Sequence, residues 1–136
     1  MRGKAPVCVI VAILATANVE AADPRGQFFT HDGVRLYYEV HALGEGLLLV
    51  HGNGGSTADF TLQIPYFSKR YCVIAMDSRD QGRSSDSAGA ITYERMAADL
   101  AALLDHLKVG PVNVLGWSDG GIEALLLPGQ RPRCDS

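Results

Sequence analysis

The sequence has little positive charge, few cysteines and no long apolar run, and each shortage excludes a class of protein. Twelve Lys and Arg stand against fifteen Asp and Glu, a formal net charge of −3 in 136 residues. We therefore expect no nucleic acid as a partner, because its phosphate backbone needs a basic surface. Three Cys without a Cys-x-x-Cys pair argue against a disulfide scaffold and against a zinc site. The 47% apolar share suits one packed domain.

Residues 1–21 have the pattern of a secretory signal peptide. Arg2 and Lys4 precede nine uninterrupted apolar residues, 7–15, and Val19-Glu20-Ala21 offers small residues to a signal peptidase. A membrane anchor is one alternative, but a span needs about 20 apolar residues; a buried N-terminal strand is the other. We expect residues 1–21 to direct export to the periplasm or the cell exterior, with no stable membrane span.

Strand patterns recur after this segment. Alternating apolar and polar residues predict a hairpin whose strands are 27–30 and 34–41, joined at the turn Asp32-Gly33. Apolar runs predict strands that are buried on both faces; these runs are 47–50, 71–76 and 112–115, the last with Asn113 among its apolar residues.

Helices are expected between these strands. The first begins at Ser56 or Thr57 and is broken or bent at Pro65. The second has an apolar stripe from Met96 to Leu107, and Gly110-Pro111 ends it. Strands that alternate with amphipathic helices are typical of an α/β protein with a mostly parallel sheet and helices on both faces.

The motif Gly116-x-Ser118-x-Gly120 follows the third apolar run and precedes an apolar stretch, 122–127. A serine in such a strand–turn–helix is held on a sharp, strained turn with its hydroxyl exposed. We expect the flanking glycines to avoid collisions with strand and helix, and Trp117 to pack beneath the turn. Ser118 is the candidate nucleophile; a plain tight turn is the alternative.

An acyl-transfer site also needs donors for the oxyanion of its tetrahedral intermediate. The backbone N–H of Asp119 is one candidate, and the loop 51–55 supplies the second, for which we favour the amide of Asn53. A phosphate cradle in this loop is disfavoured because the Gly-x-x-x-x-Gly-Lys-Ser/Thr spacing is missing. The Asp119 carboxylate either attracts a cationic substrate group or favours the start of a helix.

Three segments together resemble the α/β-hydrolase family, in its serine-esterase-like group: residues 51–55, 77–84 and 116–121. The resemblance runs from about residue 27 to residue 127 and covers the N-terminal half of the fold. It implies an α/β-hydrolase fold, Ser118 as nucleophile, amides of Asn53 and Asp119 as oxyanion donors, no cofactor or metal, and a small-molecule ester or related acyl substrate. A serine at the elbow argues against the family's dehalogenases and epoxide hydrolases.

The sequence departs from that family in two places. Asp80 stands where the family's Asp-x-Arg-Gly-x-Gly-x-Ser turn has its first glycine. The family also places an acid and then a histidine after the serine, whereas Glu123 and Asp135 are the acids here and no His follows Ser118. His51 is a candidate base, but we favour a structural role because the family's His-Gly position is structural.

The last nine residues lack the secondary-structure patterns of the preceding sequence. Residues 128–136 show neither helical nor strand periodicity, and we interpret them as an aberrant or disordered tail after a frame shift or early stop.

The expected organisation is thus a signal peptide (1–21), the N-terminal part of a hydrolase domain (22–127) and the tail (128–136). The alternative to a serine hydrolase is a truncated, inactive fragment; a third possibility is a partner chain that supplies the acid and His. Oligomeric state and a Cys72–Cys134 pair stay open.

Overall fold

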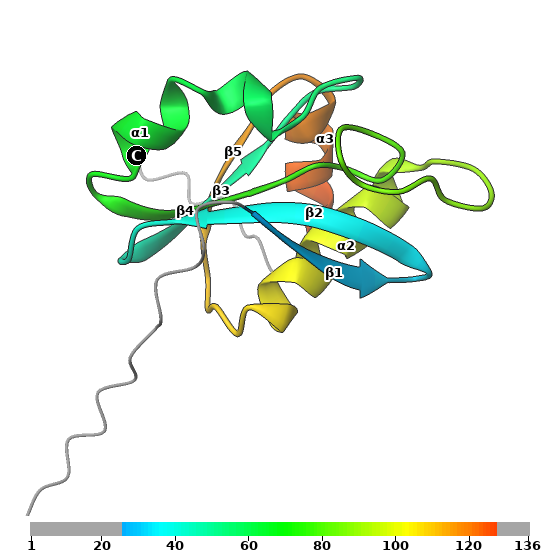
Figure 1. Cartoon of the computed structure of the whole chain (residues 1–136), viewed down its shortest axis with the longest axis horizontal. Helices are drawn as coiled ribbons and strands as arrows, with labels where there is room; N and C mark the ends of the chain where they lie inside the picture. The colour runs from blue at the N-terminus through cyan, green and yellow to red at the C-terminus, as the bar shows by residue number, and fades with distance from the viewer. Residues whose placement is uncertain (1–25, 128–136) are drawn as a thin grey trace, which may run out of the picture.

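The elements of the chain follow the expected order. The computed structural model describes residues 26–127, so the expectations for residues 1–21 and 128–136 lie outside the described residues. The elements, in order, are β1 (Gln27–His31), β2 (Val34–His41), β3 (Glu45–Val50), the 3₁₀ helix η1 (Thr57–Phe60), α1 (Gln63–Phe67), β4 (Tyr71–Met76), α2 (Tyr93–His106), β5 (Asn113–Gly116) and α3 (Asp119–Leu126). Figure 1 shows their arrangement.

The strands form one mixed sheet in the order β1-β2-β4-β3-β5. β3 lies between β4 and β5 and is parallel to both, with Val50 opposite Met76 on one side and Gly116 on the other. β1 and β2 form the expected antiparallel hairpin, and β2 also runs antiparallel to β4. The parallel strands therefore all end at the same edge of the sheet, where the loops after β3, β4 and β5 meet.

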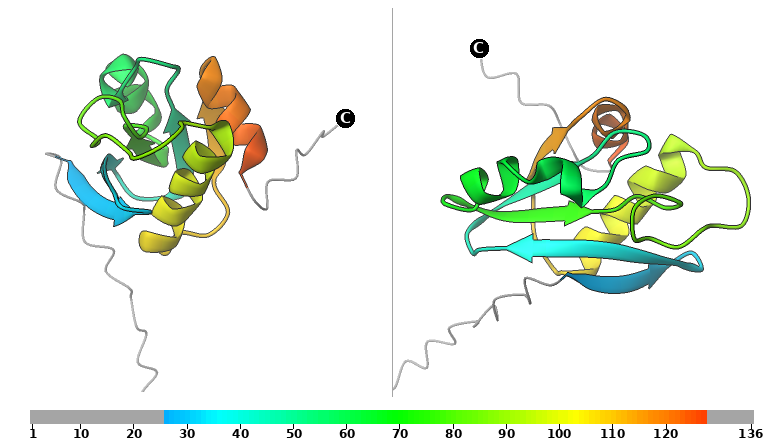
Figure 2. Two further views of the ribbon diagram at one scale, coloured as in Figure 1. Left: turned by 90° about the vertical axis from the view of Figure 1, so that its right-hand side faces the viewer. Right: turned by 45° about the horizontal axis from the view of Figure 1, so that its top comes forward.

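Side chains alternate between the two faces of the sheet, and helices cover both faces. Leu47 and Leu49 pack with Phe60 on the face that η1 and α1 cover. Leu48 and Val50 belong to the larger core on the opposite face, which α2 covers. Figure 2 shows α1 on one side of the sheet and α2 with α3 on the other. The predicted α/β architecture with helices on both faces is confirmed.

The first predicted helix is interrupted, but not at Pro65. Ser56 caps η1 through a capping box, in which its side chain accepts a hydrogen bond from Ala58 N and the Asp59 carboxylate accepts one from Ser56 N. α1 then begins at Gln63, so Pro65 lies in its first turn, where a missing N–H removes no helical hydrogen bond.

The second predicted helix, α2, ends before Gly110-Pro111. Its last residue is His106, and Lys108 adopts a left-handed φ of 53°. Lys108 N bonds to Asp105 O at 3.1 Å and Val109 N bonds to Leu104 O at 3.2 Å, which is a Schellman motif. A non-glycine residue in the left-handed region therefore ends the helix, which the apolar stripe alone did not predict.

The strand β5 is less buried than expected. None of its residues is fully buried, because β5 lies at the edge of the sheet formed by residues 26–127, where it pairs only with β3. Within residues 26–127, no helix is long and apolar enough to cross a membrane.

Candidate active site

Ser118 lies between β5 and α3 on a strained backbone. Its φ of 54° and ψ of −121° fall outside the regions that residues with a side chain favour, at a cost of about 1–3 kcal/mol. The residue is exposed, so the turn directs its side chain toward solvent. The sequence motif predicted this geometry.

Two glycines make the sharp turn possible. A Cβ on Gly116 would overlap the carbonyl group of Gly120, and a Cβ on Gly120 would overlap the carbonyl oxygen of Val50. Because these neighbours are backbone atoms, they cannot rotate away. Trp117 N donates to Val50 O at 2.9 Å, which fixes the start of the turn to the end of β3.

The loop after β3 packs directly against the serine. A Cβ on Gly52 would lie 3.2 Å from the Ser118 Cβ, so a larger residue there would push the two segments slightly apart. Asn53, the next residue, is exposed and Asp119 is half-buried. The backbone amides of Asn53 and Asp119 donate no hydrogen bond to any residue in the range 26–127.

A glutamine from the next loop holds this segment, and sequence reasoning missed it. The Gln81 side-chain oxygen accepts a hydrogen bond from Gly54 N at 2.6 Å, and Gly54 has a left-handed φ of 73°. Gln81 therefore fixes the loop immediately after Asn53. No local signal in the sequence indicates this bond, because it joins two loops that follow different strands.

His51 has a structural role. Its ring is buried, Nδ1 lies 2.7 Å from Gly52 O, and Nε2 accepts a hydrogen bond from Ser78 N at 3.0 Å. The proton must therefore sit on Nδ1, and neither nitrogen is left to accept a proton from Ser118. This geometry favours the structural interpretation over the catalytic one.

The other three histidines lie at other places in the fold. His31 Nδ1 is 2.8 Å from the Asp99 carboxylate, and His41 Nε2 is 2.8 Å from Glu39. His106 stacks on the Phe29 ring at a centroid distance of 5.3 Å. None of these contacts brings an imidazole to Ser118.

The loop after β4 is held by its own side chains, among them Asp77. This buried carboxylate accepts hydrogen bonds from Thr57 N at 2.6 Å and Arg83 N at 2.7 Å. Ser84 Oγ donates to Asp77 O at 2.6 Å and accepts from Tyr37 N at 2.9 Å. These bonds join the loop to both η1 and β2.

Asp80 adopts the left-handed conformation that the family's glycine would adopt. Its φ is 61°, and its carboxylate accepts hydrogen bonds from Ser87 N and Ser87 Oγ, both at 2.6 Å. The two bonds offset the steric cost of the side chain. The departure from the family pattern is therefore accommodated locally.

A buried ion pair fastens the same loop to α2. Arg79 donates two hydrogen bonds to Asp99, each 2.7 Å long, and both side chains are buried. Asp32 and Arg95 extend the pair at the surface, 2.9 Å apart. This bidentate geometry compensates the desolvation of both charges.

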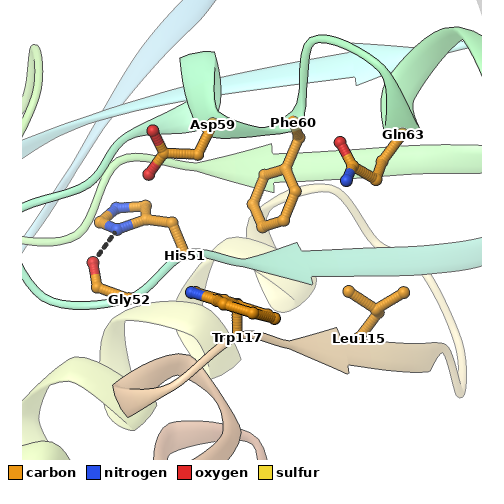
Figure 3. Close-up of a pocket in the computed structure, with 7 residues that line it drawn as sticks. All are labelled: His51, Gly52, Asp59, Phe60, Gln63, Leu115 and Trp117. Carbon is orange, nitrogen blue, oxygen red and sulfur yellow. Dashed lines mark hydrogen bonds between the residues drawn. The ribbon is translucent and has the colours of Figure 1, made fainter.

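A pocket of about 240 Å³ lies beside the elbow. Figure 3 shows its lining, with the Phe60 ring reaching in from η1 and the Trp117 ring on the elbow side. Its other lining residues are His51, Gly52, Asp59, Gln63 and Leu115. The expectation that Trp117 packs beneath the turn is wrong: the residue is 72% exposed, because within residues 26–127 no strand lies on the outer side of β5.

Within the described range, no group of three His, Cys, Asp or Glu side chains is placed to hold a metal ion. Cys72 is a half-buried free thiol, and burial raises its pKa. Cys134 lies outside the described residues.

Comparison with known proteins identifies the class. The family model described as alpha/beta hydrolase fold matches residues 46–135, and the chain belongs to this family. Serine hydrolase BPHL of Homo sapiens is 37% identical over 138 residues, covering 91% of this chain and 47% of that protein. The 3-oxoadipate enol-lactonase 2 of Acinetobacter baylyi is 33% identical over 95 residues, covering 68% of this chain and 36% of that protein.

Solved structures agree with this assignment. The crystal structure of a hydrolase from Pseudomonas aeruginosa matches with a TM-score of 0.69 and 32% identity, over 72% of this chain and 38% of the other. The chain spans 36%, 42% and 47% of the length of three curated relatives, which is less than half in each case. These three relatives are named as hydrolases, and the structure corresponds to the N-terminal part of the hydrolase fold.

Proposed function

We propose that this chain carries the nucleophile and the oxyanion hole of a serine hydrolase that acts on a carboxylic ester or a related acyl bond. Ser118 is the nucleophile in this proposal, and the amides of Asn53 and Asp119 stabilise the oxyanion. The observation that carries it is the backbone of Ser118, strained at φ 54° and exposed at the edge where the parallel strands end. A plain turn would not need this strain, because a glycine would remove it.

The two unbonded amides support the assignment of the oxyanion hole. Asn53 follows Gly52, which lies against Ser118, and Asp119 is the first residue of α3. Amides at a helix start carry partial positive charge and suit a developing oxyanion. The apolar rings beside the elbow, Phe60 and Trp117, suit the carbon part of a small acyl substrate.

The comparisons support the reaction class. A lactone is a cyclic ester, and one relative is named as an enol-lactonase; another is named as a serine hydrolase. The chain covers less than half of each, so the activity of a whole protein of this kind is part of the proposal.

A second candidate is that the chain as printed is catalytically inactive. The observation that favours it is the engagement of all four histidines by other groups. Without an imidazole to remove its proton, a serine hydroxyl is a weak nucleophile. Oxyanion stabilisation alone leaves only a residual rate.

A fluorophosphonate probe separates the two candidates. We expect slow labelling at Ser118, at least about tenfold faster with free imidazole as an external base, and no labelling of Ser118→Ala. Ser56→Ala, which changes another serine near the same edge, is the control and should label like the wild type. An unlabelled Ser118 in the folded chain, with imidazole present, would reject the proposed nucleophile.

We also propose export, from the pattern of residues 1–21. Expression with its own N-terminus should yield a secreted or periplasmic chain whose first residue is Ala22. An intracellular chain that retains Met1 would contradict this.

A further inference from the structure

Glu123 is the least satisfied charged group in the core of the described chain. It lies on α3 and is 1% exposed. Both of its carboxyl oxygens are buried without a hydrogen-bond partner. A carboxylate in this position would be an uncompensated charge in the interior, which proteins avoid by keeping the group neutral.

The groups around Glu123 offer it no cation. On its own helix, Asp119 lies one turn earlier, and α2 contributes Asp99 and Tyr93. Arg79, the cation that pairs with Asp99, donates it two hydrogen bonds of 2.7 Å. Its remaining nitrogen, Nη1, is buried and makes no hydrogen bond within residues 26–127, so it does not bond to Glu123.

The strands beneath α3 supply no cation either. β5 carries no titratable side chain, and Glu45, the only one on β3, accepts a hydrogen bond from Asn113 at 2.8 Å. His51, just beyond β3, uses both ring nitrogens on other partners. Burial first, and then the charges of Asp119 and Asp99, raise the pKa of Glu123 to about 8.

The position of α3 decides the geometry of the elbow. Ser118 is the N-cap of α3, and Gly120 packs so closely on Val50 O that no Cβ would fit between them. A shift of α3 away from α2 would therefore move the serine and the Asp119 amide together.

We propose that Glu123 is a positioning residue that seats α3 against α2 only in its neutral acid form, so that loss of its proton at mildly alkaline pH loosens the elbow around Ser118. The consequence for the reactivity of Ser118 rests on the proposed function. The loosening of α3 does not, because it depends only on packing and charge.

The direction of the pH effect follows from linkage. The unfolded chain ionises Glu123 near its ordinary pKa of 4.5, while the folded chain keeps the proton up to about pH 8. Folding therefore loses stability from about pH 4.5 upward until the native pKa is passed. Glu123→Gln, which cannot ionise, removes this loss.

The test uses the whole chain and its single tryptophan. Trp117 is the only Trp in the sequence and precedes Ser118, so its fluorescence reports on the elbow. Thermal unfolding and native fluorescence are measured from pH 5 to pH 9.5 for the wild type, Glu123→Gln and Glu94→Gln. Glu94 is an exposed glutamate on α2 and is the matched control.

We expect the wild type to lose at least about 5 °C more of its Tm than Glu123→Gln between pH 5 and pH 9. We also expect a fluorescence transition near pH 8 in the wild type and in Glu94→Gln that is absent from Glu123→Gln. Equal pH profiles for all three chains would overturn the inference. So would a transition that persists in Glu123→Gln.

A labelling profile distinguishes this inference from the proposed function. With imidazole present, fluorophosphonate labelling of Ser118 should fall above pH 8 in the wild type and not in Glu123→Gln. If no chain labels but the Trp117 transition still depends on Glu123, the positioning of α3 stands and the proposed nucleophile fails. If labelling occurs with the same pH profile in both chains, the nucleophile stands and the positioning role fails.

Discussion

The turns after β4 and β5 lie at the same edge of the sheet, yet they stabilise unusual backbone in opposite ways. In the turn after β4, Asp80 has a φ of 61°, and side-chain hydrogen bonds from Ser87 hold it. In the turn after β5, Ser118 has a φ of 54° without a side-chain cap bond, and close packing of Gly116 and Gly120 holds it.

The difference shows how a fold keeps a reactive group free. The β4 turn uses nearly all its polar side chains for structure: Asp77 accepts two amides, and Ser84 both donates and accepts. The β5 turn obtains its rigidity from backbone contact alone, so the Ser118 hydroxyl and the Asp119 amide make no structural bond. Substitutions at four positions, Gly120, Asp77, Ser118 and Asp80, test this contrast.

The largest effect is expected at Gly120. Gly120→Ala places a Cβ into the carbonyl oxygens of Val50 and His51. Because these are backbone atoms that move only at high cost, we expect the free energy of unfolding to fall by at least about 3 kcal/mol. Urea denaturation measures this loss. Gly121→Ala is the control, since its Cβ meets only Gly116 O at 3.8 Å; equal effects at both sites would refute the packing argument.

The next largest effect is expected at Asp77. Asp77→Ala leaves the buried amides of Thr57 and Arg83 without an acceptor, which should lower the free energy of unfolding by about 2–4 kcal/mol. Asp77→Asn retains one side-chain oxygen and should lose about half as much. A change below about 1 kcal/mol for Asp77→Ala would show that this turn does not depend on its side chains.

A smaller effect of opposite sign is expected at Ser118. Ser118→Gly relieves the positive φ and should raise the free energy of unfolding by about 1 kcal/mol, because no structural bond is lost. Ser118→Ala retains the strain and should match the wild type within about 0.5 kcal/mol. Chemical denaturation of the three chains gives the comparison, and a Ser118→Gly chain less stable than wild type would contradict it.

The smallest effect is expected at Asp80. Asp80→Gly relieves a positive φ but removes both bonds to Ser87, so the two effects offset and the change should stay within about 1 kcal/mol. Asp80→Ala keeps the strain and loses the bonds, which should cost about 2 kcal/mol. If thermal unfolding shows a higher Tm for Asp80→Ala than for Asp80→Gly, the hydrogen bonds to Ser87 are not what stabilises this turn.

Local pattern was sufficient to predict most of the fold and the elbow. The hairpin, the strands β3 and β4, the body of α2 and the glycine-flanked serine follow from periodicity and spacing over a few residues. Each of these features depends on neighbours in sequence, so each can be recognised within a few residues. The structural role of His51 was also expected, but from the resemblance to the family, because its partner Ser78 lies 27 residues away in sequence.

The end of α2 was missed because Lys108, which is not glycine, adopts the left-handed φ. Features that depend on contacts between distant segments were also missed: the exposure of Trp117 follows from the place of β5 in the sheet. The bond from Gly54 to Gln81 joins two loops, and Glu123 is buried by the packing of α3 on α2. None of these has a short-range signature.

The register of the sheet also implies an order of events during folding. His31 pairs with Val34 across a tight turn, whereas Val50 must find Gly116 after most of the chain has been made. Pairing over a long separation closes a large loop and comes late. A ribosome-bound chain can complete the hairpin and the β3–β4 pair well before β5 emerges. We therefore expect Ser118 to acquire its strained backbone only as β5 docks, after the loops that follow β3 and β4 have formed.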